Sequence, residues 1–540
     1  MDILFYLLIA IGKAIYKAIQ KRKGTAEANA PGAGARAGKP QSGASARPTV
    51  DPRLASALAR ELGRMVALAE SAGELDTRLS ALATRYRKLG TRGNVFIEVI
   101  DKRLRPSIAE AEVEVRKGLA TLSSQGPIDA IHTLRNDHTL GHAVGVLEAA
   151  GTRTQLLEVM ADWREDPRTG FMLADADAIA AAIFEPAQAF ARTHGLDFPT
   201  QRPIAAPASG AESLWIGLLP PGYPVIFVPD DFDRDLYRQA SVPHEIGHLL
   251  WFQVAGLADE MTEVADIGAE PTLLGFEGGR VTGTLHQPFT AWLPEIAADA
   301  MAMLLMGPAA LRGMLHTFAE PGAPDSVLTA GATSDGTYAP HPPAQLRVHM
   351  AAWMLHRSGF HREAEALVGE WQSLHGDPDT VILPCQGGKR VRINQKVFLD
   401  FITPRLEAWV MGEYTAFAGH RIESVPGLVM TASLWSRVKS RADDLISGTA
   451  FNDNGRIALA AAIEAQAKAP ERHARIATGL RAAVLGRDAG ERHAADRHYN
   501  RKKAGGTRHR LADEVRDALL LREFLGTPAF RGRRKPGART

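Results

Sequence analysis

Two histidines and a glutamate stand within five residues of one another, where the chain reads His-Glu-Ile-Gly-His from position 244 to 248. The order matches the pattern H-E-x-x-H. On an α-helix, successive residues turn by about 100°, so His244 and His248 lie about 40° apart and Glu245 about 100° from His244. Two imidazoles one turn apart can bind one metal ion, and the carboxylate between them can act as a general base beside it. The spacing therefore predicts a metal-binding helix.

The residues around this motif favour a helix that is held rigidly. Pro243 suits a first helical turn, because its missing N–H has no helical partner there in any case. The apolar run from Leu249 to Phe252 would bury the helix and fix the orientation of the two histidines. The alternative is a buried amphipathic helix with two ordinary core histidines, so the metal hypothesis needs a third ligand.

A third ligand is expected on a second helix, within residues 291–306. The only acids of this apolar segment are Glu295 and Asp299, four positions apart. Acids on such a face are costly to bury unless they are paired or bound to a metal. One carboxylate is expected to bind the metal and the other to hydrogen-bond a ligand histidine; the alternative is that both face solvent. Rival ligands are the three acids of the preceding Gly- and acid-rich stretch, Glu260, Glu263 and Glu270.

A third segment whose residues could take part in a reaction spans residues 335–355. His341 stands between prolines where a helix is predicted to begin, and Arg347 lies further inside that helix. A rigid loop that holds a histidine at this place suits a donor to a developing oxyanion. An ordinary turn before a helix is the alternative. For Arg347, the sequence leaves open a substrate contact and a structural role.

Taken together, HEIGH at 244–248, E-x-x-A-D at 295–299 and H-P-P-x-x-x-R at 341–347 resemble the gluzincin zinc metallopeptidases of the HtpX and CAAX-prenyl-protease type. The resemblance covers roughly residues 212–356. It implies that the two histidines and the first acid of E-x-x-A-D bind zinc, and that the glutamate of H-E-x-x-H is the general base. It also implies that the aspartate supports a ligand histidine and that the histidine of H-P-P helps to stabilise the transition state. Carried over in that order, these residues are His244, His248, Glu295, Glu245, Asp299 and His341. The chain departs from the family in showing neither a multi-span membrane portion around the motif nor a clear Asn on the strand before it.

The predicted fold class is mainly α with a small mixed β-sheet (α+β), a zincin-like catalytic domain flanked by helical regions. Residues 213–219 and 223–228 read as two short strands, and an edge strand beside the metal helix could pair with a substrate backbone. A chain of 540 residues should contain two or three domains. The predicted organisation is an amphipathic membrane-anchor helix at 1–23, a flexible linker at 24–50, a helical region at 51–200, a zincin-like metallopeptidase domain at 201–360 and a mainly helical C-terminal region with a basic tail at 361–540.

The amino-terminal segment predicts membrane association. Residues 3–19 are apolar except for Lys13 and Lys17, which share one helical face with Lys21. No basic stretch precedes the run and no small-residue cleavage site follows it, unlike in a cleaved signal peptide. Residues 3–23 are therefore expected to associate with the membrane, either as an anchor on its surface or as a short span with an outside amino terminus. In both cases the basic flank and the catalytic part are expected on the cytoplasmic face. The alternative is a helix that docks on the body of the protein.

Composition sets further bounds. The chain is 45% hydrophobic and 23% charged, as is ordinary for globular proteins, and its net charge is +2. The single cysteine, Cys385, excludes an intrachain disulfide framework. The basic stretches at 487–510 and 531–535 are expected to be solvated, with binding of nucleic acid or anionic lipid as the alternative, and nucleic acid is not an expected partner.

The sequence thus predicts zinc-dependent hydrolysis of peptide bonds by metal-activated water at a His2Glu site, in a membrane-associated protease that acts on a protein or peptide. The competing hypothesis is a non-catalytic, zinc-stabilised membrane scaffold, a pseudo-peptidase. Glu245 favours the enzyme, because a purely structural site has no use for a base and usually closes its fourth position with a protein ligand.

Overall fold

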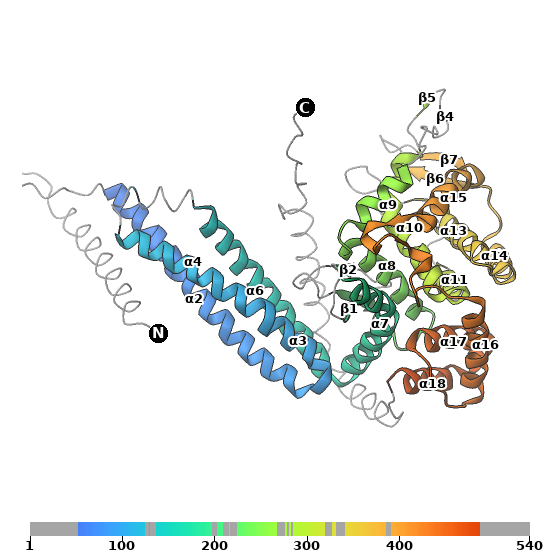
Figure 1. The fold of residues 1–540 in the computed structure, drawn as a ribbon, viewed down its shortest axis with the longest axis horizontal. Coiled ribbons are helices and arrows are strands. Elements are labelled where there is room, and N and C mark those ends of the chain that lie inside the picture. The colour runs from blue at the N-terminus through green and yellow to red at the C-terminus, as the bar shows by residue number, and fades with distance from the viewer. Residues whose placement is uncertain are drawn as a thin grey trace, which may run out of the picture. The chain divides into compact units, whose positions relative to one another are not determined.

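The structure is a computed structural model that describes residues 52–124, residue 129 and, with internal gaps, residues 137–485. The predicted anchor, the linker and the basic tail lie outside the described residues, as do Glu270 and Cys385. The described chain forms two compact units, one up to Glu158 and one from Val159 onward. It is mainly helical with a few short strands, which confirms the predicted fold class (Figure 1). The internal gaps are residues 197–201, 209–214, 217–223, 230, 267–275, 278–279, 282–284, 319–326, 331–340 and 385–389.

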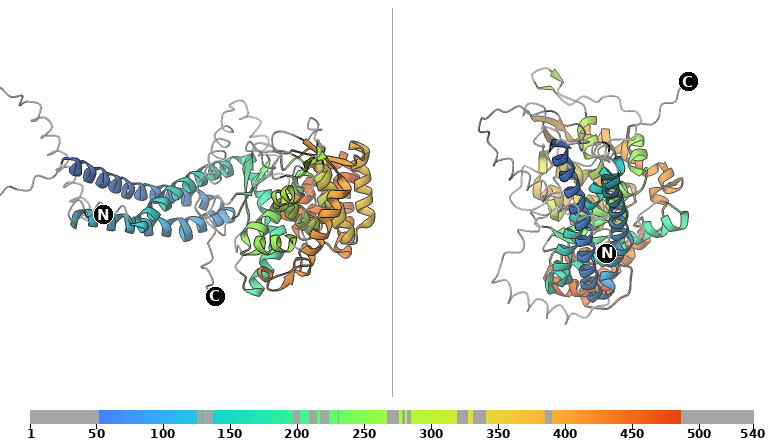
Figure 2. Two further views of the ribbon diagram at one scale, coloured as in Figure 1. Left: turned by 90° about the horizontal axis from the view of Figure 1, so that it is seen from above. Right: turned by 90° about the vertical axis from the view of Figure 1, so that its left-hand side faces the viewer.

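The first unit consists of long helices that run alongside one another (Figure 1, Figure 2). In the first of them, Leu75, Leu79, Leu82 and Tyr86 form one buried stripe at helical spacing, as expected of an amphipathic helix. The buried Tyr86 hydroxyl donates a hydrogen bond of 2.6 Å to the carbonyl of Leu157. The helices are α2 (Pro52–Lys88), α3 (Asn94–Val99), the π-helix η2 (Ile100–Leu104), α4 (Arg105–Ser124) and α6 (His138–Glu165), which extends past the boundary between the units.

A three-stranded sheet lies before the metal-binding motif in the second unit. Its order is β1 (Ile204–Ala208), β3 (Val225–Pro229), β2 (Trp215–Ile216); β1 is parallel to β3 and β2 is antiparallel. The central strand β3 is buried along its whole length. The sequence predicted β2 and β3 but not β1, because Ile-Ala-Ala-Pro-Ala lacks the run of β-branched and aromatic residues typical of strands.

The outer edge of β1 is closed by an ion pair. Ala205 N–H donates to Asp177 Oδ1 at 2.6 Å, and Arg164 Nη2 donates to the Ala205 carbonyl at 2.8 Å. The guanidinium also contacts the Asp177 carboxylate at 3.1 Å. These side chains satisfy the outward N–H and carbonyl of Ala205, which hinders the addition of another strand at this point of the edge.

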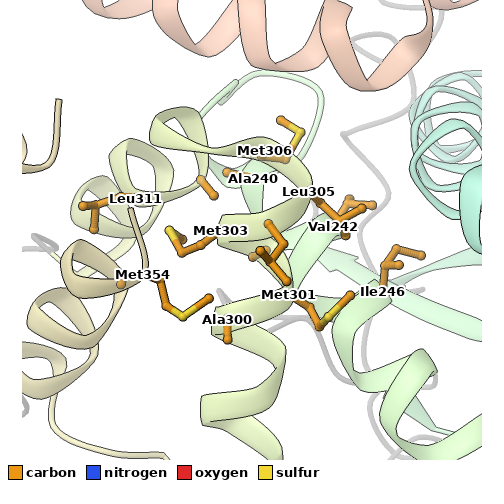
Figure 3. Close-up of a cluster of buried hydrophobic side chains, with 14 of the residues drawn as sticks. Ala240, Val242, Ile246, Ala300, Met301, Met303, Leu305, Met306, Leu311 and Met354 are labelled. Atoms are coloured by element: carbon orange, nitrogen blue, oxygen red, sulfur yellow. The ribbon is translucent and has the colours of Figure 1, made fainter. Parts of the chain in front are cut away.

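Two helices that carry the motifs pack unusually closely. They are α8 (Ser241–Gln253) and α10 (His286–Met306). A Cβ atom at Gly247 would lie 2.6 Å from the Cα atom of Ala298, so only glycine permits this approach. Val242 and Ile246 of α8 lie among the buried side chains of α10 (Figure 3).

The C-terminal helices belong to the same core and hold the end of α10. Met430 N–H donates to the Leu304 carbonyl at 2.6 Å, and Arg456 Nη1 donates to the carbonyls of Leu305 and Leu428 at 3.1 Å. The carbonyls of Leu304 and Leu305 lie in the last turn of α10, where the helix leaves them without helical partners. Helices α17 and α18 pack on α7, α17 also packs on α11, and α16 packs on α17 and α18 (Figure 1). The remaining helices are α7 (Pro167–His194), α9 (Leu257–Asp266), α11 (Pro308–Phe318), α13 (Ala344–Arg357), α14 (His361–His375), α15 (Gln395–Met411), α16 (Ala432–Ser447), α17 (Gly455–Lys468) and α18 (His473–Leu485).

Between α14 and α15, two strands pair in antiparallel orientation, β6 (Thr380–Pro384) with β7 (Arg390–Asn394). Two-residue strands form two further antiparallel pairs, β4 (Phe276–Glu277) with β5 (Arg280–Val281) and β8 (Glu413–Tyr414) with β9 (His420–Arg421).

Among the described residues, one stretch, Pro288–Met306 of α10, is long and apolar enough to cross a membrane. Of that stretch, 83% is buried inside the protein. Core helices have the same length and composition, so this helix is weak support for membrane association.

Candidate metal centre

His244, His248 and Glu295 converge on one point. The Nε2 atoms of the two histidines lie 3.1 Å apart. Glu295 faces both of them, with Oε2 at 3.3 Å from His244 Nε2 and Oε1 at 3.2 Å from His248 Nε2. Among the described residues, this is the one group of three or more such side chains whose ligand atoms come close enough to hold a metal ion.

These separations fit a metal ion. Imidazole nitrogens and carboxylate oxygens bind zinc at about 2.0–2.2 Å, and the corners of a tetrahedron of that size lie about 3.3–3.5 Å apart. The three ligand pairs, at 3.1, 3.2 and 3.3 Å, are close to that edge. A group of two histidines and one carboxylate could therefore hold a metal with little rearrangement.

Asp299 and Arg347 stand behind the ligands. Asp299 Oδ1 lies 2.9 Å from His244 Nδ1, the ring nitrogen that faces away from the other ligands. Arg347 donates to both oxygens of Asp299, from Nε and Nη2, each at 2.7 Å. An acid that accepts from the far nitrogen fixes the tautomer and orientation of a ligand histidine. Of the two acids on α10, Glu295 thus has the place of a ligand and Asp299 the place of its support.

The charges of the centre also fit a divalent cation. Glu245, Glu295 and Asp299 are 2%, 7% and 3% exposed, and Arg347 is 8% exposed. With neutral histidines, as metal binding requires, three negative charges and one positive charge leave a net charge of −2. Burying such a charge without compensation is costly. A cation of charge +2 would balance it.

The contacts within the centre set its pKa values. Burial would lower the pKa of His244, but hydrogen bonds to Asp299 and Glu295 raise it to about 10. Burial lowers the pKa of His248 despite its contact with Glu295. Although burial opposes ionisation, the two histidines hold the pKa of Glu295, and Arg347 that of Asp299, below the usual range. Both acids are therefore ionised, as ligation and histidine orientation require.

Glu245 and His341 line a cleft beside the ligands, together with His244, Asp299 and Arg347. Glu245 is buried at its wall. His341 has 42% of its side chain exposed, and its Nε2 lies 3.4 Å from Glu295 Oε2. The structure thus brings all seven predicted site residues into one centre, although they come from three separate segments.

The described rival ligands lie elsewhere, on α9. Glu260 accepts a hydrogen bond from Ala416 N–H at 3.3 Å, and Glu263 is exposed. Sequence reasoning missed Gly247 as a site residue. Its signal was a helix-breaking glycine inside a helical motif, which indicates that another backbone approaches there. It also missed α11, which forms one wall of the cleft and has no chemical motif.

The chain matches no protein-family model, no curated protein and no solved structure.

Proposed function

We propose that this protein is a zinc-dependent metallopeptidase of the gluzincin type, related in its motifs to the HtpX and CAAX-prenyl-protease type. One observation carries the proposal: two histidine nitrogens and a glutamate converge within about 3.3 Å, while Glu245, on the same helix as the histidines, lines an adjacent cleft. The set of two imidazoles and one carboxylate is that of catalytic zinc sites, which keep one position for water or substrate.

His244, His248 and Glu295 would hold the zinc. When bound, zinc supplies Lewis acidity that polarises a carbonyl and lowers the pKa of water. Asp299, itself fixed by Arg347, holds the Nδ1 proton of His244, so that Nε2 offers its lone pair toward the ligand centre.

Glu245 acts as the general base. Its carboxylate takes a proton from the attacking water and passes it to the leaving amine, and general acid–base catalysis of this kind contributes about 10²–10⁴-fold. His341, half exposed at the cleft, donates a hydrogen bond to the oxyanion that develops on the scissile carbonyl. The substrate is a protein or peptide.

The test measures zinc content and cleavage of a broad peptide library by the wild type and Glu245→Gln. The wild type is expected to hold close to one zinc per chain and to cleave peptides; the variant should keep the zinc and lose at least about 100-fold in rate. Glu263→Gln, on the exposed face of α9, is the matched control and should retain full activity. Equal activity of wild type and Glu245→Gln would refute the mechanism.

A zinc-replete wild type that cleaves nothing would instead support the scaffold hypothesis. The burial of Glu245 at the cleft argues against the scaffold hypothesis, because a purely structural metal site gains nothing from a buried carboxylate next to its ligands.

The membrane part of the proposal rests on the sequence of residues 3–23, with their apolar run and lysine stripe. We propose that this segment anchors the protein on the cytoplasmic face. Deletion of residues 1–23 should move the protein from the membrane to the soluble fraction and leave zinc-dependent activity unchanged. Full-length protein that is wholly soluble at low and high salt would refute the anchor.

A further inference from the structure

A second cleft lies on the other face of α13 from the metal centre. Its volume is about 550 Å³, within the range for binding sites, roughly 300–1,000 Å³. His349 and Trp353, one turn apart on α13, line it. Arg347, which contacts Asp299 of the metal centre, lies two positions before His349 and therefore about 200° around the helix. The two clefts share no described lining residue, so α13 presents a different face to each.

The walls of this second cleft come from three parts of the chain. They are α13, the segment that joins α14 to β6, and the stretch from the end of β7 into α15 (Figure 1). All three belong to the second unit.

A buried chain of hydrogen bonds ends at this cleft. Trp371 Nε1 donates to Gln345 Oε1 at 2.6 Å. Gln345 Nε2 lies 3.0 Å from Gln395 Oε1 and 3.1 Å from His349 Nε2. Trp371 and Gln345 are fully buried, and Gln395 is 7% exposed. A satisfied network of buried polar groups is rigid, so it fixes His349 and Gln395 at the wall of the cleft.

The indole N–H can only donate, and this fixes the direction of every bond that follows. The oxygen of Gln345 must face Trp371, so its amide nitrogen donates to both other neighbours. Gln395 then accepts through Oε1, and His349 accepts through Nε2 and carries its proton on Nδ1. Burial lowers the pKa of His349 despite the nearby carboxylate of Asp377, which also favours the neutral ring. Two donors remain for a ligand, the Nδ1–H of His349 and the amide of Gln395, and no described residue accepts from either.

The second cleft is negatively charged and partly apolar. Three aspartates and one lysine line it. Lys396 pairs with Asp400 at 2.8 Å, whereas no lysine or arginine of the described chain pairs with Asp377 or Asp379, both exposed. Trp353 is half-buried and adds an aromatic surface. A cation on an apolar stem fits this combination, because the stem packs on the ring while the charged head reaches the carboxylates.

We infer that the cleft between α13 and α15 binds a lysine or arginine side chain of a polypeptide, with the stem on Trp353 and the charged head at Asp377 and Asp379. Backbone carbonyls of the bound segment accept from His349 and Gln395. Anions are disfavoured, because they would meet three carboxylates and one lysine that is already paired. The site is independent of the proposed peptidase function, since it contains none of the described residues of the metal centre.

Two sources can supply such a side chain, another protein and the basic stretch of this chain at 487–510. Residues 51–485 contain 52 Asp and Glu against 40 Lys and Arg, whereas residues 486–540 contain 7 against 15. The 16 residues from Leu485 to Arg501 can span at most roughly 55 Å. The experiment therefore needs an arm for each source.

The first arm measures peptide binding by calorimetry to full-length protein that carries Glu245→Gln, a change that prevents cleavage of the probes. The probes are acetyl-Ala-Ala-Arg-Ala-Ala-amide and the same peptide with Gln in place of Arg. The Arg peptide should bind at least about 10-fold more tightly, and Asp377→Asn together with Asp379→Asn should abolish this preference. Trp353→Ala should weaken binding of the Arg peptide by about 2–5-fold.

Glu365→Gln, an exposed acid of α14 that does not line the cleft, is the matched control and should leave both affinities unchanged. Unchanged zinc content and thermal unfolding of the Asn variant show that its fold is intact. Equal binding of the two peptides, or a preference for Arg that survives the loss of both aspartates, overturns the inference.

The second arm replaces the eight Lys and Arg residues of 487–510 by Gln in the same Glu245→Gln protein. A segment attached to the protein acts at millimolar effective concentration. If it occupies the cleft, its replacement should tighten binding of the Arg peptide by about 10-fold or more; if another protein supplies the side chain, the affinity should stay the same. Both results keep the cleft and its ligand class. Absence of binding of the Arg peptide to both proteins at millimolar concentration overturns the inference.

Discussion

The first unit and the metal centre use charged residues in opposite ways. In the first unit, ion pairs lie on helix surfaces: Lys102 pairs with Glu98 at 2.7 Å with 69% of the lysine side chain exposed, and Arg116 pairs with Glu112 at 2.8 Å. In the metal centre, three acids and Arg347 are buried together.

The difference shows that buried charged side chains indicate a functional site, whereas exposed ion pairs do not. Exposed pairs one helical turn apart contribute only about 0.3–0.5 kcal/mol, and solvent accommodates either partner alone. Buried charges are retained only when neighbours or a metal compensate them. Charged residues of the same types are therefore uninformative in the helices of the first unit and decisive in α8, α10 and α13.

The largest expected effect is removal of a ligand. Glu295→Ala or His248→Ala should weaken zinc binding by more than about 100-fold, beyond the roughly 10–100-fold loss typical of residues that only support a ligand. Glu112→Ala, which breaks an exposed pair in the first unit, should leave zinc binding unchanged. Titration against a chromophoric chelator measures the affinities. Equal zinc affinity in all three variants would remove the metal centre.

Two glycines inside helices give the next contrast. At Gly247, an added methyl group meets the α10 backbone, so Gly247→Ala should destabilise the fold by about 1–3 kcal/mol and weaken zinc binding. At the exposed Gly73 of α2, a Cβ atom would meet nothing within 4 Å, so Gly73→Ala should stabilise the first unit by about 0.5–1 kcal/mol.

Urea unfolding with separate probes for the two units measures both changes. The same sign at both glycines would contradict the close packing of α8 on α10.

Much of the centre was predictable because chemistry and helical spacing act locally. The order of the histidines, the isolated acids of α10 and the proline-bounded His341 follow from residue types at fixed intervals. Two of the three strands beside the motif were recognisable for the same reason.

The rest depends on contacts between distant segments. Which acid of α10 faces the ligands is set by the rotation of that helix against α8 at Gly247, and no local pattern encodes it. The ion pair of Arg347 with Asp299 joins residues 48 positions apart. The apolar wall of α11 consists of residues ordinary for any core helix, so only the fold reveals that they line a cleft.

Loss of the carboxylate that supports His244 should have a smaller effect than loss of a zinc ligand and a larger effect than loss of a surface ion pair. Asp299→Asn keeps the shape and removes the charge, and it should lower zinc affinity or activity by about 10–100-fold. The matched change is Glu158→Gln in the first unit, where Arg78 donates to both carboxylate oxygens at 2.7 and 2.8 Å on an exposed surface. It should alter stability by at most about 1 kcal/mol and leave zinc binding unchanged. Equal, small effects of both changes would place Asp299 with the ordinary ion pairs.

The smallest effect is expected for an ion pair whose burial is intermediate between that of the exposed pairs of the first unit and that of the charges in the metal centre. His316 of α11 contacts Asp235, in the loop before α8, at 3.1 Å, and 49% of the histidine side chain is exposed. Burial raises the pKa of Asp235, but His316 and the N–H groups of Tyr237 and Arg238 outweigh burial and lower it.

A lowered pKa means that the folded state favours the carboxylate. Its contribution to stability is therefore fully present above the unfolded value, about 3.9, and is lost as the pH falls through the lower folded value. His316→Ala should cost at most about 1 kcal/mol at pH 6, as for an exposed pair, and the difference from the wild type should vanish in strong acid. Urea unfolding of both proteins across this pH range measures it. A loss of several kcal/mol, or one that grows as the pH falls, would show that this pair belongs with the buried charges of the metal centre rather than with the surface pairs of the first unit.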